Sequence, residues 1–291
     1  MDRIAIVTIV HQSPVILRKW ITHHSTLVGQ RNLFVIAHGT CPEHQDFKGE
    51  YNYLTVPRLF HLDIDAQRMN AVSDFVSFLQ HYYDAVLYTD ADELLLLDPS
   101  LDISFQDHIL SDTEKTRAPL FFNIIPKPDQ TSLDWQKPIL SQSLALSFNP
   151  KLCNPCVFYQ RPHLFGRHAT LEVPHRIDPG LFMFHLKYVD PQLAGHHYDA
   201  LSDEIGTAKR GAPSEKNDRN LRGWSSGRAR INDWIEMVQS RPLTDTDNIA
   251  HAGEMLVSLK SINKPPNRRF RFFGTTPNEN WRIPDSIAHA L

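Results

Sequence analysis

One stretch of the sequence decides the fold class: residues 85–97 read AVLYTDADELLLL. A short apolar run at residues 85–88 leads straight into Asp90 and Asp92, and four leucines follow at residues 94–97. Such a run is typical of a strand that is buried on both faces of a parallel sheet. Open α/β sheets bind their ligands beyond the carboxyl ends of the strands. The two carboxylates are therefore predicted at the place where an α/β sheet holds a ligand.

Strand and helix patterns alternate along the first hundred residues. Ser13 and Pro14 predict a helix start, with Ser13 as the N-cap and Pro14 in the first turn. Apolar residues recur at helical spacing over residues 17–28 and again over residues 69–83. This order predicts an α/β fold with a mostly parallel, doubly wound sheet. Its first four strands are expected at residues 4–10, 33–37, 52–56 and 85–88.

The pattern loosens in the second half of the chain. Residues 121–125 and 181–185 are predicted strands, and residues 217–240 carry the apolar anchors of a helix. We therefore expect residues 1–195 to form the ligand-binding and catalytic domain. Residues 196–291 are expected to form a partly helical C-terminal extension that packs on it.

The composition narrows the class of protein. The chain has 291 residues, of which 41% are hydrophobic, and its 30 Lys and Arg against 33 Asp and Glu give a net charge of −3. This balance argues against a protein built to neutralise nucleic-acid phosphates, so no nucleic-acid partner is expected. No segment approaches the roughly 20 apolar residues of a membrane span, and we expect no transmembrane segment. Three cysteines are a sparse set that fits a reducing compartment, which predicts a cytoplasmic location.

Asp90 and Asp92 are the strongest candidates for chemistry. Two carboxylates one residue apart at a strand end can hold a hard divalent cation through oxygen ligands. Such a cation would neutralise a diphosphate leaving group. The alternative is a solvated turn whose carboxylates cap the next element, because D-x-D also occurs by chance. The apolar strand before the pair and the leucines after it favour a positioned site.

Three segments together resemble a known family. Residues 85–97, residues 181–190 (LFMFHLKYVD) and Gly166-Arg167-His168 look like the corresponding segments of GT-A glycosyltransferases, most of all the family 2-like and family 92-like branch. The resemblance covers roughly residues 3–190. It implies a GT-A fold and a metal-dependent, inverting transfer of a sugar from a nucleotide-sugar donor, with a UDP-sugar favoured. It also implies a hydroxyl acceptor on a sugar or glycolipid, a Mn²⁺ or Mg²⁺ cofactor, and a role in cell-surface polysaccharide or glycoconjugate synthesis.

The resemblance implies roles for particular residues. Asp90, Asp92 and His185 would be the metal ligands, although His185 could instead be a core-strand histidine bonded to backbone. The donor site departs from the family pattern, because His11-Gln12 replaces a run with Asn and Glu and His38 replaces an acidic residue. The donor-binding set implied by the resemblance is Thr8, His11, His38, Arg68, Asn70, Asp90 and Lys187.

The general base is left open by the sequence. Glu93 is adjacent to the D-x-D pair but could point into the fold. Asp129, Asp134 and Asp178 are expected in loops that could reach an acceptor. The candidate catalytic set is therefore Asp90, Asp92, Glu93 and Asp178, with Asp129 and Asp134 as further carboxylates.

Three weaker patterns also suggest binding sites. Cys153 and Cys156 have C-x-x-C spacing without a second cysteine pair, so a zinc site would need His163 and His168 as well. His196 and His197 could face the mouth of a site. The tail segment at residues 264–273 interleaves Arg and Phe, and it could contact a membrane surface peripherally or a lipid-linked acceptor, or pack its aromatic residues on the domain.

Two other classes of function stay open. A non-catalytic carbohydrate-binding or nucleotide-binding protein on a degenerate GT-A scaffold fits the departures at His11 and His38. A D-x-D phosphohydrolase ranks lower, because its nucleophile follows the first strand and Asp90 follows the fourth. The chain has no P-loop, no G-x-G-x-x-G segment and no G-x-S-x-G elbow, which excludes the classes that depend on them.

Overall fold

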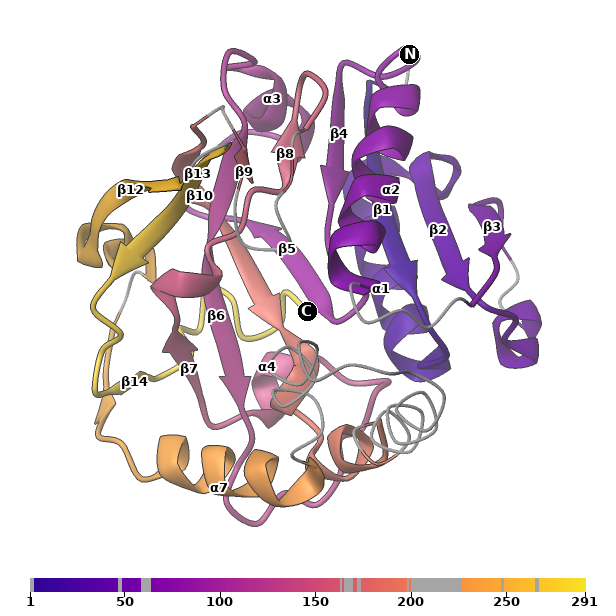
Figure 1. The fold of residues 1–291 in the computed structure, drawn as a ribbon. Helices are drawn as coiled ribbons and strands as arrows, with labels where there is room; N and C mark the ends of the chain where they lie inside the picture. Colours follow the sequence, from indigo (N-terminus) through magenta and orange to yellow (C-terminus); the bar gives the residue numbers. More distant parts are fainter. Residues whose placement is uncertain are drawn as a thin grey trace.

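Four parallel strands and two helices alternate in the N-terminal part, as the sequence predicts (Figure 1). β1 pairs in parallel with β2 and β4, and β2 pairs in parallel with β3. These strands lie side by side on the right of Figure 1. The elements are β1 (Ile4–Val10), α1 (Pro14–Val28), η1 (Gln30–Asn32), β2 (Leu33–His38), η2 (Pro42–Asp46), β3 (Asn52–Val56), α2 (Ile64–Leu79) and β4 (Ala85–Tyr88).

The chain is described by a computed structural model. It covers residues 3–46, 49–58, 64–162, 164, 170–171, 174–197, 199, 227–246, 249–264 and 267–291. The predicted histidine-bearing segment at residues 166–168, and His163, lie outside these residues.

The two N-terminal helices cover opposite faces of the sheet. Ile4 and Ile6 of β1 belong to the same apolar cluster as the buried face of α1. Ala5 and Val7, which alternate with them, belong to the cluster that contains the buried face of α2. The β1 strand is therefore buried on both sides, which explains why six of its seven residues are apolar. The predicted double winding is observed in this part of the sheet.

The start of α1 differs from the prediction in one detail. Pro14 does occupy the first turn, but the Ser13 side chain makes no capping hydrogen bond. Gln12 and Ser13 both have positive φ angles, of 54° and 57°, which is uncommon for residues other than glycine. The chain thus turns sharply between the carboxyl end of β1 and the helix.

The second half makes the sheet mixed. β8 runs antiparallel to both β4 and β6, so β4 and β6 point the same way. β10 pairs in parallel with β6 and antiparallel with the short β5, and β7 is antiparallel to β6. The elements are β5 (Glu93–Leu97), α3 (Phe105–Leu110), β6 (Arg117–Ile125), α4 (Ile139–Gln142), β7 (Ala145–Phe148), η3 (Pro150–Leu152), β8 (Val157–Phe158), β9 (Thr170–Leu171), β10 (Arg176–His185) and η4 (Leu186–Tyr188).

The last hundred residues add to this sheet as well as packing on it. β14 pairs with β7 and β11 pairs with β14, and the backbone oxygen of Leu291 accepts a hydrogen bond from the Ile139 N–H. β12, β13 and β9 form a separate three-stranded sheet. The extension is partly helical as predicted, and the expected division at residue 195 stays a prediction. Its elements are α7 (Gly227–Gln239), β11 (Leu243–Thr244), η6 (Ile249–Met255), β12 (Leu256–Lys264), β13 (Asn267–Gly274) and β14 (Asn280–Trp281), preceded by a helix at residues 191–197.

The predicted helix at residues 217–240 is observed from Gly227 onward, and its earlier residues lie outside the described part. Within the described part of the chain, none of the helices combines the length and apolar character needed to cross a membrane.

Candidate functional site

The carboxyl ends of β1, β2, β4, β6 and β10 lie at one edge of the sheet, because these strands all point the same way. The residues that follow or end four of these strands are His11, His38, Asp90 and His185. The sequence predicted a ligand site at this edge, and the structure brings these four residues to it.

Strand pairing places His185 beside the D-x-D pair. β10 runs antiparallel to β5, and the register sets His185 opposite Glu93. The Leu186 N–H donates to the Asp92 carbonyl at 2.7 Å, which continues the pairing past the end of β5. Asp92 and His185 are 93 positions apart in the chain, and the pairing of β5 with β10 makes them neighbours.

Asp92 and His185 are in direct contact. Asp92 Oδ2 lies 3.2 Å from His185 Nε2, and both side chains are largely shielded from solvent. His185 Nδ1 lies 2.9 Å from Asn123 Oδ1 of β6. An amide oxygen can only accept a hydrogen bond, so Nδ1 carries the hydrogen. Nε2 then either carries a second hydrogen toward Asp92 or presents its lone pair to a cation shared with the carboxylate.

The geometry of this pair fits two ligands of one divalent ion. Metal–nitrogen and metal–oxygen bonds are roughly 2.1 Å long, so adjacent ligands at right angles lie about 3 Å apart. The observed 3.2 Å matches that spacing. A metal-ligating histidine also typically donates its other N–H to an oxygen, as His185 does to Asn123. The donor set of one carboxylate and one imidazole suits Mn²⁺ better than Ca²⁺.

Asp90 is held differently from Asp92. The Tyr88 hydroxyl donates to Asp90 Oδ1 at 2.6 Å, and the Asp90 N–H donates to Glu93 Oε2 at 2.9 Å. Among the residues that the structure describes, no three His, Cys, Asp or Glu side chains are placed to hold one metal ion. The expected ligand set of Asp90, Asp92 and His185 is therefore brought together only in part.

The Asp92 carboxylate is stabilised in its charged form. Burial alone would raise the pKa of Asp92, but the charge and hydrogen bond of His185 lower it. The nearby charges of Lys187 and His197 act in the same direction, and the pKa falls well below its usual range. Lys187 and His197 thus belong to the electrostatic surroundings of the site.

The buried side chain of Glu93 stabilises the turn between β4 and β5. Its side chain is 3% exposed and accepts the Asp90 N–H, which closes the turn between β4 and β5. The expectation that Glu93 points into the fold agrees with this placement. Its carboxylate is therefore engaged with backbone rather than presented to an acceptor.

Helix α1 donates and accepts hydrogen bonds at the turn between β4 and β5 and at β5 itself. Trp20 Nε1 donates to Thr89 Oγ1 at 2.7 Å, directly before Asp90. His23 Nε2 lies 2.5 Å from the Leu95 carbonyl, and His24 Nε2 accepts from the Leu95 N–H at 3.4 Å. Burial lowers the pKa of His23 to about 4 and that of His24 well below its usual value. Both histidines are neutral parts of the packing at neutral pH.

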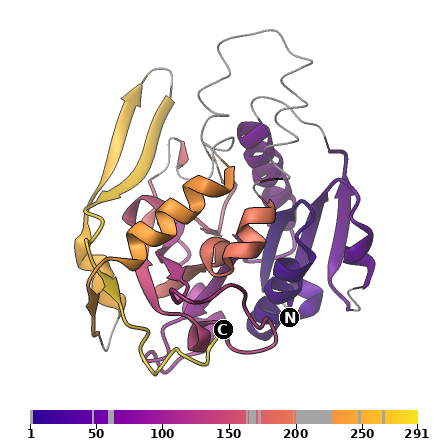
Figure 2. The ribbon, with the colours of Figure 1, turned by 90° about the horizontal axis from the view of Figure 1, so that it is seen from below.

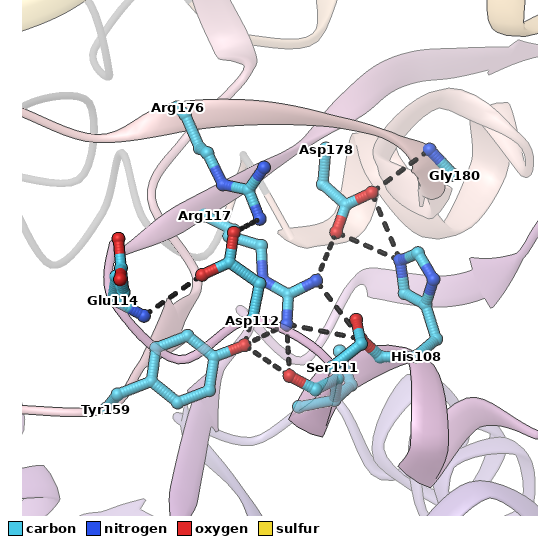
Figure 3. A network of polar contacts seen from close by, with 10 residues as sticks. His108, Ser111, Asp112, Glu114, Arg117, Tyr159, Arg176, Asp178 and Gly180 are labelled. Atoms are coloured by element: carbon cyan, nitrogen blue, oxygen red, sulfur yellow. Dashed lines mark hydrogen bonds and ion pairs between the residues drawn. The ribbon is translucent and has the colours of Figure 1, made fainter.

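Asp178 lies far from this site. The prediction that it sits in a loop is wrong: it belongs to β10, seven residues before His185, which places it roughly 20 Å away along the strand. Figure 3 shows its carboxylate between Arg117, at 2.7 Å, and His108, at 3.0 Å. Burial would raise the pKa of Asp178, but His108 and Arg117 hold it below its usual value.

The Asp178 network is a closed structural unit. Arg117 is 1% exposed and donates to Tyr159 Oη, to the carbonyls of His108 and Ile109, and to Asp178. The Gly180 N–H also donates to Asp178 (Figure 3). Every oxygen of this carboxylate therefore has a protein donor, and Asp178 acts in folding rather than at the site edge.

The predicted donor side is brought together in part. His11 Nδ1 lies 2.7 Å from the His38 carbonyl, and Arg58 Nη1 lies 3.2 Å from His38 Nδ1. Gly39 follows with φ of 90°, and a Cβ there would come within 3.1 Å of Arg58. Arg58 is a residue that sequence analysis missed. Its position two residues after β3 was the available signal.

The other predicted donor residues are less closely placed. Thr8 is fully buried inside β1 and presents no surface to a ligand. Arg68 is half-buried and Asn70 is exposed. Both lie in the first two turns of α2, which begins at the same edge of the sheet as the carboxyl end of β3. Lys187 lies two residues after His185 in the chain, with Nζ 5.6 Å from the Tyr188 ring.

Aromatic residues link the C-terminal extension to the site. The His185 ring lies 5.9 Å from that of Tyr188, and Tyr188 stacks on Trp234 of α7 with centroids 3.9 Å apart. His196 and His197 are exposed at the end of the helix at residues 191–197. Trp234 thus brings α7 to the wall of the site, which the sequence did not predict.

Cys153 and Cys156 form no disulfide. Cys153 and Cys156 are buried, and burial raises the pKa of Cys153 to about 12. A thiol with such a pKa stays protonated at neutral pH in the metal-free protein. The histidines that would complete a zinc site, His163 and His168, lie outside the described residues.

Comparison with known proteins adds no assignment: no protein-family model matches the sequence, and no curated protein matches it.

Proposed function

We propose that this protein is a metal-dependent glycosyltransferase with a GT-A fold that transfers a sugar from a nucleotide-sugar donor. One observation carries the proposal: Asp92 contacts His185 at the carboxyl edge of the sheet, and Asn123 orients the imidazole from the opposite side. An α/β fold with a ligand edge of this kind supports the proposal. The D-x-D segment between β4 and β5 supplies one member of the pair.

Asp92 and His185 would hold a Mn²⁺ or Mg²⁺ ion. Bound there, the ion would neutralise the charge that develops on a departing nucleoside diphosphate. Asp92 is suited to this part because the surrounding positive charges keep it ionised. Magnesium-type sites often use only one or two protein ligands and complete their shell with phosphate oxygens and water. A two-residue protein site is therefore sufficient for this chemistry.

The donor would lie along the ends of β1 and β2. His11, His38 and Arg58 form a contiguous polar group there, and the charge of Lys187 acts on Asp92. Arg58 and Lys187 would contact the phosphates, since guanidinium and ammonium groups both pair with phosphate oxygens. A UDP-sugar donor and a sugar or glycolipid acceptor stay part of the proposal, as does an inverting displacement. A cytoplasmic location is likewise proposed, on the sparse cysteines.

Of the carboxylates named from the sequence as candidate bases, Asp129 is the one that the structure leaves available. It lies in the turn after β6, and Gln130 in the same turn donates to the Val189 carbonyl at 3.0 Å, close to His185 in the chain. Asp134 is paired with Lys137 and Glu93 with backbone. A base at Asp129 would take the proton of the acceptor hydroxyl as the new glycosidic bond forms.

A non-catalytic binding protein on the same scaffold is the second candidate. The observation that favours it is the Asp90 carboxylate, which is held by Tyr88 rather than gathered with Asp92 and His185. Such a protein would bind a nucleotide and metal without turning over a donor.

A screen of nucleoside diphosphates with and without Mn²⁺, read by thermal unfolding, tests the proposal. A ligand that binds only the native state raises the unfolding midpoint. We expect a metal-dependent rise for one nucleotide that Asp92→Asn abolishes and Asp102→Asn, an exposed carboxylate elsewhere, retains. Donor hydrolysis or transfer by the same protein separates the enzyme from the binding protein. No metal-dependent nucleotide binding at all would overturn the proposal.

A further inference from the structure

Two residues at the carboxyl end of β1 have an uncommon backbone conformation. Gln12 and Ser13 have φ angles of 54° and 57°, and among the described residues they are the only ones other than glycine with positive φ. Such conformations persist only where neighbouring groups hold them, and they cluster at functional sites. The strands β1 and β2 point downward in Figure 1, so Figure 2, seen from below, faces the edge at which this turn lies. The β1–α1 turn, residues 11–13, therefore has a strained backbone at the candidate ligand edge.

A buried histidine from another segment holds this turn. His44 of η2 is 2% exposed, and its Nε2 lies 2.8 Å from the Gln12 carbonyl oxygen. A carbonyl oxygen only accepts hydrogen bonds, so Nε2 carries the hydrogen and donates it. The backbone N–H of His44 donates to the Cys41 carbonyl at 3.1 Å, which anchors His44 within η2.

A tyrosine of β3 sets the orientation of the His44 ring. Tyr53 Oη lies 2.9 Å from His44 Nδ1. Burial lowers the pKa of His44, so the imidazole is neutral at neutral pH. Because Nε2 holds the single ring hydrogen, Nδ1 accepts from the Tyr53 hydroxyl. Two successive hydrogen bonds thus connect β3 through η2 to the β1–α1 turn.

The bond from His44 fixes the plane of the Gln12–Ser13 peptide. In a planar trans peptide the N–H and the carbonyl point in opposite directions, so the Ser13 N–H points away from His44. Rotating this peptide by a half-turn would remove the positive φ of Ser13, but it would also break the bond to His44. His44 therefore opposes the relaxation of the turn, and it determines whether the N–H or the carbonyl faces away from η2.

We propose that His44 is a positioning residue for the nucleotide-sugar donor, an inference that rests on the proposed function. His44 is too buried to reach a ligand, and it acts through the Gln12–Ser13 peptide. The Ser13 N–H is thereby held ready to donate to an oxygen of the donor. His11, the first residue of the turn, contacts His38 of the proposed donor side, so the turn borders that side.

Calorimetric titration with UDP in the presence of Mn²⁺ tests the inference on the full chain. His44→Phe keeps a ring but removes the N–H donor. Loss of this bond shifts the turn toward its relaxed form, and we expect about a fivefold loss of UDP affinity. His44→Gln keeps an N–H donor and should lose less. His175→Phe changes an equally buried histidine, which precedes β10 at the opposite edge, and it should bind UDP as the wild type does.

Adding Ser13→Gly separates positioning from a general loss of stability. Glycine adopts positive φ about as readily as negative φ, so this substitution lowers the cost of the strained turn. In the His44→Phe background it should restore the UDP affinity to within about twofold of the wild type. An affinity that His44→Phe leaves unchanged, or a loss that Ser13→Gly does not repair, overturns the inference.

An NMR measurement without ligand distinguishes failure of this inference from failure of the proposed function. Positive φ brings the N–H proton of a residue close to its own Hα, which gives a strong nuclear Overhauser signal between them. With isotope-labelled serine, the Ser13 signal should be strong in the wild type and weak in His44→Phe, and Ser13→Gly identifies it by its loss. Equal signals in wild type and His44→Phe overturn the inference whether or not UDP binds. The expected signals without any metal-dependent nucleotide binding would contradict the proposed function, and with it the donor as the partner of the turn.

Discussion

Replacing Arg117 with methionine should lower the free energy of unfolding by about 4 kcal/mol. The guanidinium is 1% exposed and lies 2.7 Å from Asp178, which is itself 4% exposed. Methionine fills part of the volume but leaves the carboxylate buried without the guanidinium, with His108 and the Gly180 N–H as its remaining partners. Removing one partner of a buried ion pair costs about 3–5 kcal/mol, because the remaining charge is uncompensated. The network of Figure 3 would lose its centre.

Urea denaturation of wild type and Arg117→Met measures this loss. Arg282→Met is the matched control, since Arg282 pairs with Asp245 where both side chains are mostly exposed, and its loss should stay below about 1 kcal/mol. Adding Asp178→Asn to Arg117→Met should recover part of the stability, because a neutral amide needs no buried cation. A loss below about 1 kcal/mol for Arg117→Met, or equal losses for both arginines, would refute this reasoning.

Three further results are expected. Burial lowers the pKa of His23 and His175 to about 4 in the native state. The unfolded state therefore takes up protons first as the pH falls. The free energy of unfolding should drop between about pH 6.5 and pH 4, by up to about 3 kcal/mol per histidine. Urea denaturation at pH 7.5 and at pH 5 measures this drop, and an equal free energy of unfolding at the two pH values would contradict it. Asn123→Leu should weaken Mn²⁺ binding in the presence of UDP about 10- to 100-fold, as measured by calorimetry. Asn123→Asp keeps a hydrogen-bond acceptor for His185 and should bind Mn²⁺ more tightly than the leucine variant. Equal Mn²⁺ affinities of the wild type and both variants would show that Asn123 does not orient the imidazole. Trp20→Phe removes the hydrogen bond to Thr89 and should lower the free energy of unfolding by about 1 kcal/mol, and an unchanged value would place the support of the turn elsewhere.

The sequence predicted the parts of the fold that depend on local pattern. β1 and β4 are almost wholly apolar runs, and their ends could be located within a residue. Because parallel strands end at one edge, the placement of Asp90 and His38 at that edge followed. The proximity of Asp92 and His185 was expected only from resemblance, and the β5–β10 pairing is the physical reason for it.

Longer strands that contain breaking residues were underestimated. Asp178 was expected in a loop, but β10 begins at Arg176 and includes it, together with Pro179 and Gly180, which are typical of turns. The structure accommodates these residues in an irregularity of the β6–β10 register between Asp178 and Phe182, close to Pro119 of β6. Such bulges tolerate proline, and they depend on the partner strand, which local pattern does not reveal.

Contacts that join distant segments were missed for the same reason. Asn123 is an ordinary polar residue within an apolar strand until β10 is placed beside it. Trp234 falls within the predicted helix at residues 217–240, and only the tertiary structure shows it stacked on Tyr188 next to His185. These residues have no spacing relation to Asp92, so no motif could have identified them.

Pulsed electron paramagnetic resonance of Mn²⁺ bound together with UDP addresses the paired roles of Asp92 and His185 directly. An imidazole ligand couples its nitrogen nuclei to the metal spin, and wild type should show this nitrogen modulation. His185→Gln should lose it, and His11→Gln, which changes a histidine elsewhere on the same edge, should retain it. Absence of nitrogen modulation in metal-loaded wild type, or its persistence in His185→Gln, would contradict the assignment of His185 and Asp92 as the metal-holding pair.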